Sequence, residues 1–149
     1  EPVPSLNSSD ISRKEPLEFP LRLSSAKTIA YCHSQGRNIK SLRRLTPDPV
    51  VELSSSVAEK RRIEDNDWVE IETKSGVFLA RAKISDLLAD DSVFCQHGWT
   101  DYKVSAPFKA LGKKDNFNFN SAITTENSDP ISGSIPLRCS RCEVKKLNY

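Results

Sequence analysis

The sequence is short of several residues on which common classes of protein depend. Its 149 residues include no methionine, two histidines, five glycines and four cysteines. Four unevenly spaced cysteines are too few for a fold held together by disulfides, and no apolar run approaches the roughly 18 residues of a membrane span. The chain begins EPVPSLNSSD, with neither an initiator Met nor a signal-peptide core. We therefore expect a segment of a longer polypeptide, with no membrane insertion by this segment.

The charge balance argues against binding to large polyanions. Lys and Arg together number 22 and Asp and Glu 20, so the net charge is only +2. A broad electrostatic attraction to nucleic acid or to an anionic membrane needs a stronger excess of cations. The basic runs at 43–44 and 60–62 leave a nucleic-acid binder as an alternative, but the acidic run 64–67 directly follows the second. We therefore expect no nucleic-acid partner.

The cysteines and histidines do not form a recognisable metal motif. Cys139-Ser-Arg-Cys142 is a single CxxC pair, and a structural zinc ion normally takes four ligands. His33 and His97 could complete such a site, but the residues around them do not resemble a zinc knuckle. We expect reduced thiols, as in a reducing compartment, and no metal ligand in this chain.

Motifs of a self-contained active site are also missing. The sequence has no HExxH, GxSxG, P-loop or GxGxxG pattern. A dyad of Cys32 with His33 is poorly placed, because consecutive side chains of an extended chain point to opposite faces. The carboxylate clusters coincide with turns, where solvated charge is the normal state. We expect no turnover by this chain alone.

The first twenty residues differ from the rest. They hold four of the nine prolines, mixed with polar residues, and such a segment buries too little apolar surface to offset its ordering entropy. We predict a linker or surface arm over 1–20 and one domain over 21–147. Within that domain, an interrupted strand is expected over 21–31, followed by a long polar loop over 33–49 with a helical turn at 39–45.

Short apolar segments with turn signals between them fill the middle of the chain. The Ser56-x-x-Glu59 spacing is that of a capping box at the start of a short helix over 57–62. Asn66 stands in a turn where it can adopt positive φ, and residues 68–72 alternate with Val69 and Ile71 on one face. Further strands are expected at 50–53, 77–84, 92–96 and 137–147. This pattern predicts a mainly β fold, a small closed barrel rather than a helical bundle.

Polar side chains collect where the predicted strands end. Three segments stand out, at 32–38, 96–99 and 116–120. Loops carried by a rigid scaffold commonly form binding sites. The alternative is that these are merely solvated loops, and composition alone does not decide between the two.

Motifs in a fixed order carry a resemblance to a known family. They are Pro49-Val50-Val51-Glu52-Leu53, segments 58–60 and 63–76, Val93-Phe94-Cys95-Gln96-His97-Gly98-Trp99, Asn118-x-Asn120 and segment 129–134, with segment 33–39 and Leu42-Arg43 upstream. Together, over residues 20–146, they resemble the C-terminal molybdopterin dinucleotide-binding domain of the dimethyl sulfoxide reductase family of molybdenum and tungsten oxidoreductases. The departures fall on turns, such as Asn66 where the family commonly has Gly.

The resemblance implies a fold, a cofactor and partners. The fold would be a six-stranded double-psi β-barrel with short helical insertions and long loops. The chain would close over a bis(molybdopterin guanine dinucleotide) cofactor, whose molybdenum or tungsten is carried by the parent enzyme. Its partners would be the remaining domains of that oxidoreductase. A stand-alone double-psi barrel acting as a small subunit or adaptor of such a complex is the alternative.

The resemblance also implies a set of cofactor-binding residues. These are His33, Ser34, Gln35 and Arg37 in the first loop, His97, Gly98 and Trp99 in the second, and Asn118 and Asn120 in the third. The first loop would contact the pterin or pyrophosphate edge, the second loop the second pterin, and the third the pterin or guanine end. Gly98 would let the backbone approach the ligand. Arg37 would either pair with a phosphate through both guanidinium nitrogens or remain a solvated loop cation.

Overall fold

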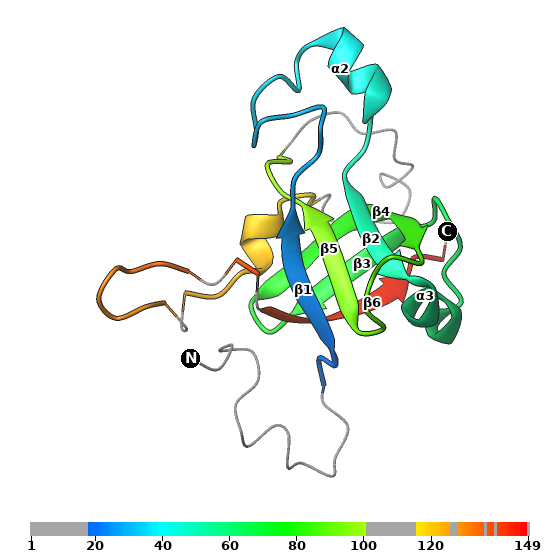
Figure 1. Ribbon diagram of the computed structural model, residues 1–149, viewed down its shortest axis with the longest axis vertical. Helices are drawn as coiled ribbons and strands as arrows, with labels where there is room; N and C mark the ends of the chain where they lie inside the picture. Colours follow the sequence, from blue (N-terminus) through cyan, green and yellow to red (C-terminus); the bar gives the residue numbers. More distant parts are fainter. Residues whose placement is uncertain (1–17, 101–115, 126–127, 136, 139, 149) are drawn as a thin grey trace.

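Six strands close into a barrel in the computed structural model, which describes residues 18–100, 116–125, 128–135, 137–138 and 140–148 (Figure 1). The strands are β1 (Leu21–Ala26), β2 (Val50–Ser54), β3 (Trp68–Thr73), β4 (Gly76–Ser85), β5 (Ser92–Gln96) and β6 (Ser140–Lys146). Within the described residues, three short helical elements accompany them: α2 (Lys40–Leu45), α3 (Ser55–Arg61) and the 3₁₀ turn η2 (Phe119–Ala122). The mainly β fold expected from the sequence is confirmed.

The strand order shows an internal twofold relation. Around the barrel the strands run β1-β5-β2-β4-β3-β6. The pairs β1–β5 and β2–β4 are parallel, and the other four pairs are antiparallel. Exchanging β1 with β4, β2 with β5 and β3 with β6 maps each pair onto a pair of the same direction. Because parallel neighbours need crossover connections, each half of the chain crosses the other, and the barrel is of the double-psi type.

The barrel interior is filled by alternate residues of each strand. Val69 and Ile71 on β3 have no exposed surface, and Phe78, Ala80 and Ala82 on β4 are at most 2% exposed. They belong to one continuous apolar cluster inside the barrel. The alternation over residues 68–72 therefore predicted the inward face of β3 correctly, because successive side chains of a strand point to opposite faces.

The turns around β3 also follow the sequence. Asn66 has φ of 69°, the left-handed conformation that asparagine tolerates better than most residues. Thr73 pairs with Gly76 across β3 and β4, so a two-residue turn joins these strands. The reversal expected at this point is confirmed.

The start of α3 differs from the expectation. The N-cap is Ser54, whose hydroxyl accepts a hydrogen bond from the amide of Val57 at 3.2 Å. The expected capping box from Ser56 to Glu59 is therefore wrong, and the helix begins two residues earlier. Ser54 is also the last residue of β2, with extended φ and ψ of −67° and 153°. The end of a barrel strand, rather than the local motif, decides where this helix starts.

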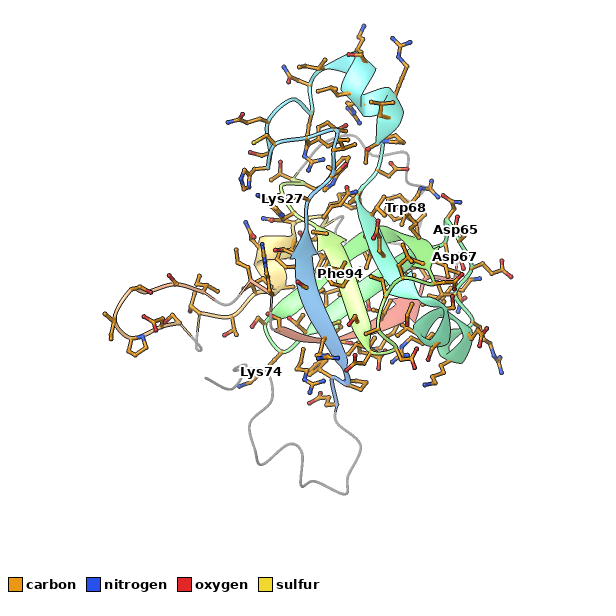
Figure 2. The ribbon with its side chains drawn as sticks, viewed as in Figure 1. Lys27, Asp65, Asp67, Trp68, Lys74 and Phe94 are labelled. Atoms are coloured by element: carbon orange, nitrogen blue, oxygen red, sulfur yellow. The ribbon has the colours of Figure 1, made fainter. Side chains whose placement is uncertain are left out.

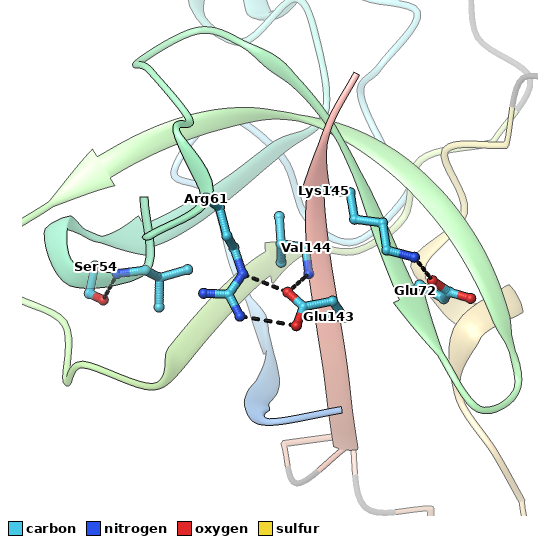
Figure 3. A network of polar contacts seen from close by, with 7 residues as sticks. Ser54, Arg61, Glu72, Glu143, Val144 and Lys145 are labelled. Atoms are coloured by element: carbon cyan, nitrogen blue, oxygen red, sulfur yellow. Dashed lines mark hydrogen bonds and ion pairs between the residues drawn. The ribbon is translucent and has the colours of Figure 1, made fainter. Parts of the chain in front are cut away.

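An ion pair ties α3 to the barrel (Figure 3). The guanidinium of Arg61 donates two hydrogen bonds to the carboxylate of Glu143, at 2.5 and 3.1 Å. The amide of Val144 donates to the same carboxylate at 2.7 Å. Arg61 lies within the basic run 60–62, so part of that run is engaged in holding α3 against β6.

Three cysteines are described, and all carry free thiols. Cys32 is exposed, whereas Cys95 and Cys142 are buried. Burial raises the pKa of both buried thiols above the ordinary value, because a thiolate is poorly solvated there. Cys139, the other member of the CxxC pair, lies outside the described residues.

The connection between β1 and β2 stands away from the barrel and carries α2 (Figure 1). The strand expected over 21–31 is shorter than predicted and ends at Ala26. The helical turn expected at 39–45 is confirmed as α2, which has no buried residue. The hydroxyl of Tyr31 donates to the carbonyl of Thr46 at 2.8 Å. This bond joins the two sides of the connection beneath α2.

Two sequence expectations are only partly covered by the described residues. The arm predicted over 1–20 lies mostly outside them, so it stays a prediction. Within the described ranges, no helix is both long enough and apolar enough to cross a membrane.

Replacing Ile71 with Ala tests the inward face of β3. The change should lower the free energy of unfolding by about 2–5 kcal/mol, because it removes a fully buried side chain and leaves a cavity. Val77→Ala is the matched control, since Val77 lies on the neighbouring strand and is 36% exposed, and it should cost under about 1 kcal/mol. Urea unfolding measures both. Equal losses in the two variants would contradict the placement of Ile71 inside the barrel.

Candidate functional site

The three polar loops leave the barrel at one end. Ala26, the last residue of β1, lies beside Gln96, the last residue of β5. The β3–β4 turn lies at the same end, because β6 runs antiparallel to both β1 and β3. The hydroxyl of Thr73 donates to the carbonyl of Ala122 at 2.6 Å, which places η2 against that turn. We call residues 27–39, 96–100 and 116–122 the loop end.

Two histidines meet at the loop end. Nδ1 of His33 and Nε2 of His97 lie 2.8 Å apart, although the residues are 64 positions apart in the sequence. The ring centroids are 5.0 Å apart and the rings are inclined at 54°. A contact this short between two imidazoles is a hydrogen bond in which one nitrogen donates and the other accepts. The two predicted loops are therefore joined by their histidine side chains.

The surroundings of His97 favour its neutral form. Burial lowers the pKa of this imidazole, and His33, Lys27 and Arg37 lower it further. The carbonyl of Ala26 acts in the opposite direction. Lys27 lies just beyond the end of β1, at the base of the α2 connection (Figure 2). Because a proton on His97 would add a cation among other cations, His97 is best accommodated as a neutral imidazole.

Arg37 lies behind this pair rather than on the surface. It is 1% exposed, and its Nε donates to the carbonyl of Gly98 at 2.7 Å. Its Nη2 donates to the carbonyls of His97 at 2.9 Å and of His33 at 3.2 Å. One side chain thus holds the backbone of both loops, directly beside the residues that carry the imidazoles.

The guanidinium of Arg37 is also enclosed by two aromatic rings. Its central carbon lies 4.3 Å from the ring centre of Tyr31 and 3.9 Å from that of Trp99. Stacking of this kind stabilises a cation by roughly 0.5–2 kcal/mol, more when it is desolvated. Trp99 itself has no exposed surface. Tyr31 was not among the predicted site residues, since nothing in its sequence context marks a partner six positions ahead.

Gly98 permits the close approach of the two loops. Its φ is 86°, and a Cβ at this position would lie 2.5 Å from both the carbonyl carbon and the carbonyl oxygen of His33. A distance under 3.0 Å is a clash with backbone that cannot move aside. The sequence analysis expected this glycine to admit a ligand. The structure provides a reason within the chain, which is the packing of one loop against the other.

The third loop is held by its own side chains and two aromatic anchors. The side-chain oxygen of Asn116 accepts from the amide of Asn118, and that of Asn118 accepts from the amide of Asn120, at 3.0 and 3.1 Å. Phe117 and Phe119 are buried between these exposed or half-buried asparagines. The alternation in this segment therefore anchors the loop through phenylalanine and leaves amide groups toward solvent.

The remaining predicted residues lie on the surface of the first loop. Ser34 and Gln35 are exposed, in a turn closed by the amide of Gln35 donating to the carbonyl of Cys32 at 2.9 Å. In the part of the chain that the structure describes, no three His, Cys, Asp or Glu side chains gather as a metal-ligand set. The loop end therefore offers imidazole, hydroxyl and amide groups, which suit hydrogen bonding to an uncharged planar ring system.

Comparisons with known proteins identify the family of this chain. Residues 21–139 match the family described as the molydopterin dinucleotide binding domain. The dopamine dehydroxylase of Eggerthella lenta is 31% identical over 131 residues, which are 87% of this chain and 12% of that protein. The alpha subunit of chlorate reductase from Ideonella dechloratans is 32% identical over 89 residues, 59% of this chain and 10% of that subunit. The chain thus spans only about an eighth or less of these relatives.

A solved structure shares the fold. Acetylene hydratase from Pelobacter acetylenicus superposes with a TM-score of 0.75 and 23% identity, covering 87% of this chain and 19% of that one. The family match covers most of the barrel and all three segments of the loop end. The chain belongs to the molydopterin dinucleotide binding domain family.

Proposed function

We propose that this chain closes over bis(molybdopterin guanine dinucleotide) as one domain of a larger oxidoreductase, with the loop end facing the cofactor. Membership of the family shows that the chain is a molybdopterin dinucleotide-binding domain. The observation that carries the finer proposal is the hydrogen bond of 2.8 Å between His33 and His97. It brings two loops that were predicted separately as cofactor-binding into one surface.

The residues at the loop end fit this cofactor. A pterin edge and a guanine present planar arrays of hydrogen-bond donors and acceptors, which imidazole and amide groups can match. Nδ1 of His97 is buried without a hydrogen-bond partner among the described residues. One nitrogen of the pair therefore still has an unused hydrogen-bonding position. When bound, the cofactor's dithiolenes hold the metal and supply the redox chemistry, and the chain supplies binding and positioning.

The predicted residues divide into two kinds by exposure. The exposed group comprises His33, Ser34, Gln35 and Asn120, with His97, Gly98 and Asn118 half-buried. We propose that these make the contacts expected for their loops, to the pterin or pyrophosphate edge, the second pterin and the guanine end. Trp99 and Arg37, which are 0% and 1% exposed, would support the same surface from the interior of the domain.

Removing one polar group from the loop end tests this assignment. His97→Ala and Asn120→Ala, made in the native polypeptide that carries this sequence, should each lower the pterin content about fivefold, since one hydrogen bond contributes about 1 kcal/mol. The pterin is released, oxidised and quantified by fluorescence, together with molybdenum and tungsten. Lys60→Ala, an exposed change on α3, is the control and should have no effect. Normal cofactor content in both loop-end variants would contradict the proposal.

The size of the native polypeptide separates the proposal from its alternative, a small subunit or adaptor. The chain has a mass of 16.7 kDa and corresponds to 12% of the dopamine dehydroxylase. We expect an immunoblot of a source-cell extract to show a band several times larger than 16.7 kDa. A band near that mass would instead favour the stand-alone barrel, and its partner subunit would be sought by native co-purification.

A substitution at Gly98 tests whether the approach of the two loops matters for binding. Gly98→Ala places a Cβ 2.5 Å from the backbone of His33, so we expect the loops to separate, with loss of cofactor and a lower Tm. Gly133→Ala is the matched control, because Gly133 also has positive φ, at 70°, but open space around it. That variant should show only the local strain of about 1–2 kcal/mol. Thermal melts and pterin content are measured for both variants. Equal changes in Tm and in pterin content would refute the role of loop packing.

A further inference from the structure

The charge of Arg37 is buried at a point where both loops converge. Its described hydrogen bonds go to the backbone carbonyls of His33, His97 and Gly98. Burying a cation is unfavourable unless hydrogen bonds and dipoles replace its water. The carbonyl dipoles and the two flanking rings serve that purpose here. The guanidinium and the two loops therefore hold each other in one arrangement.

The shape of the side chain matters as well as its charge. A guanidinium is planar and presents donors in a fixed fork, whereas an ammonium group is a compact point charge. The fork of Arg37 reaches carbonyls on both loops at once, with Nε on one and Nη2 on the other two. A lysine could occupy the site as a cation, but it could not hold these three carbonyls in the same plane.

The imidazole pair has two possible proton arrangements. Either His33 donates from Nδ1 to Nε2 of His97, or the reverse holds. In the first case the proton of neutral His97 sits on its buried Nδ1, and in the second that nitrogen keeps a lone pair. In either arrangement one proton lies between Nδ1 of His33 and Nε2 of His97, so the contact holds each neutral ring in a single tautomer.

We propose that Arg37 is a positioning residue, which holds the two loops so that His33 and His97 share one hydrogen bond and each ring keeps a single tautomer for hydrogen bonding to the ligand. The identity of that ligand rests on the proposed function. The state of the imidazole pair is a property of this chain and can be measured without the cofactor.

Nitrogen NMR of the histidine side chains in the full chain tests the proton arrangement. At mildly alkaline pH the spectrum should show a single tautomer at each ring, with one proton between Nδ1 of His33 and Nε2 of His97. The groups facing His97 are His33, Lys27, Arg37 and the Ala26 carbonyl. Averaged tautomers at both rings would overturn the proposal, and this measurement needs no variant to fold.

Arg37→Lys then separates positioning from simple packing. The variant keeps a cation but loses the fork, so the His33 and His97 signals should move to the averaged tautomers of isolated histidines. Arg44→Lys, the same change on the exposed last turn of α2, is the matched control and should leave the spectrum unchanged. A purely structural role predicts a lower Tm for Arg37→Lys with both tautomers preserved, and that result would overturn the positioning role.

A second variant tests the direction in which the charge of Arg37 shifts the pKa of His97. Arg37 lowers the pKa of His97, so Arg37→Gln should raise that pKa, because a neutral neighbour no longer opposes the imidazolium. A pH titration of the His97 ring signal measures the shift, and an unchanged or lower pKa would contradict the close approach of Arg37.

Cofactor content distinguishes failure of this inference from failure of the proposed function. In the native polypeptide, Arg37→Lys should lower the pterin content about tenfold, as for outer residues that orient metal ligands. Normal pterin content with a disrupted imidazole pair would overturn the role of the pair in binding. Normal pterin content with an intact pair would overturn the positioning role of Arg37.

Discussion

The parallel pairing of β1 with β5 is the constraint on which the loop end depends. Parallel neighbours finish at the same edge of a sheet, so Ala26 and Gln96 lie side by side. The loops that follow them therefore begin at neighbouring points of the barrel, and His33 and His97 meet although 64 positions separate them. The twofold relation of the strands makes this pairing one of two equivalent crossings, and closure of the barrel leaves no other place for these loops.

The loop end is held by buried polar contacts together with apolar packing, in which Tyr31, Trp99 and Phe117 share one buried cluster. Arg37 replaces its lost hydration with three carbonyls and two aromatic faces, while Gly98 removes the side chain that would keep the loops apart. At the other end, Arg61 meets Glu143 as an ordinary ion pair. The contrast follows from position. An ion pair fixes an outer helix to a strand, whereas a cation held by carbonyls fixes backbone on two loops and leaves their side chains available.

The same arrangement explains how a nearly neutral chain can serve an anionic, redox-active cofactor. Cations near His97 disfavour its protonation, so this imidazole offers directional hydrogen bonds rather than charge. Directional bonds suit the planar edges of pterin and guanine. A chain that covers about an eighth of its relatives then needs only to present a shaped polar surface, because in the proposed function the metal chemistry belongs to the cofactor and the holding of its bulk to other domains.

Sequence alone determined what depends on a few neighbouring residues. Alternation at Val69 and Ile71 and the positive φ of Asn66 follow from strand periodicity and from local sterics, and both were predicted. The polar residues at the ends of the predicted strands located the three loops, and the family resemblance implied their cofactor-binding role. Only the tertiary structure decided that α3 is capped by Ser54, that β1 stops at Ala26, and that Arg37 is buried. The physical reason is range, because the carbonyl partners of Arg37 on His97 and Gly98 lie 60 and 61 positions away. The ends of β1 and β2 likewise pair with strands that are distant in the sequence.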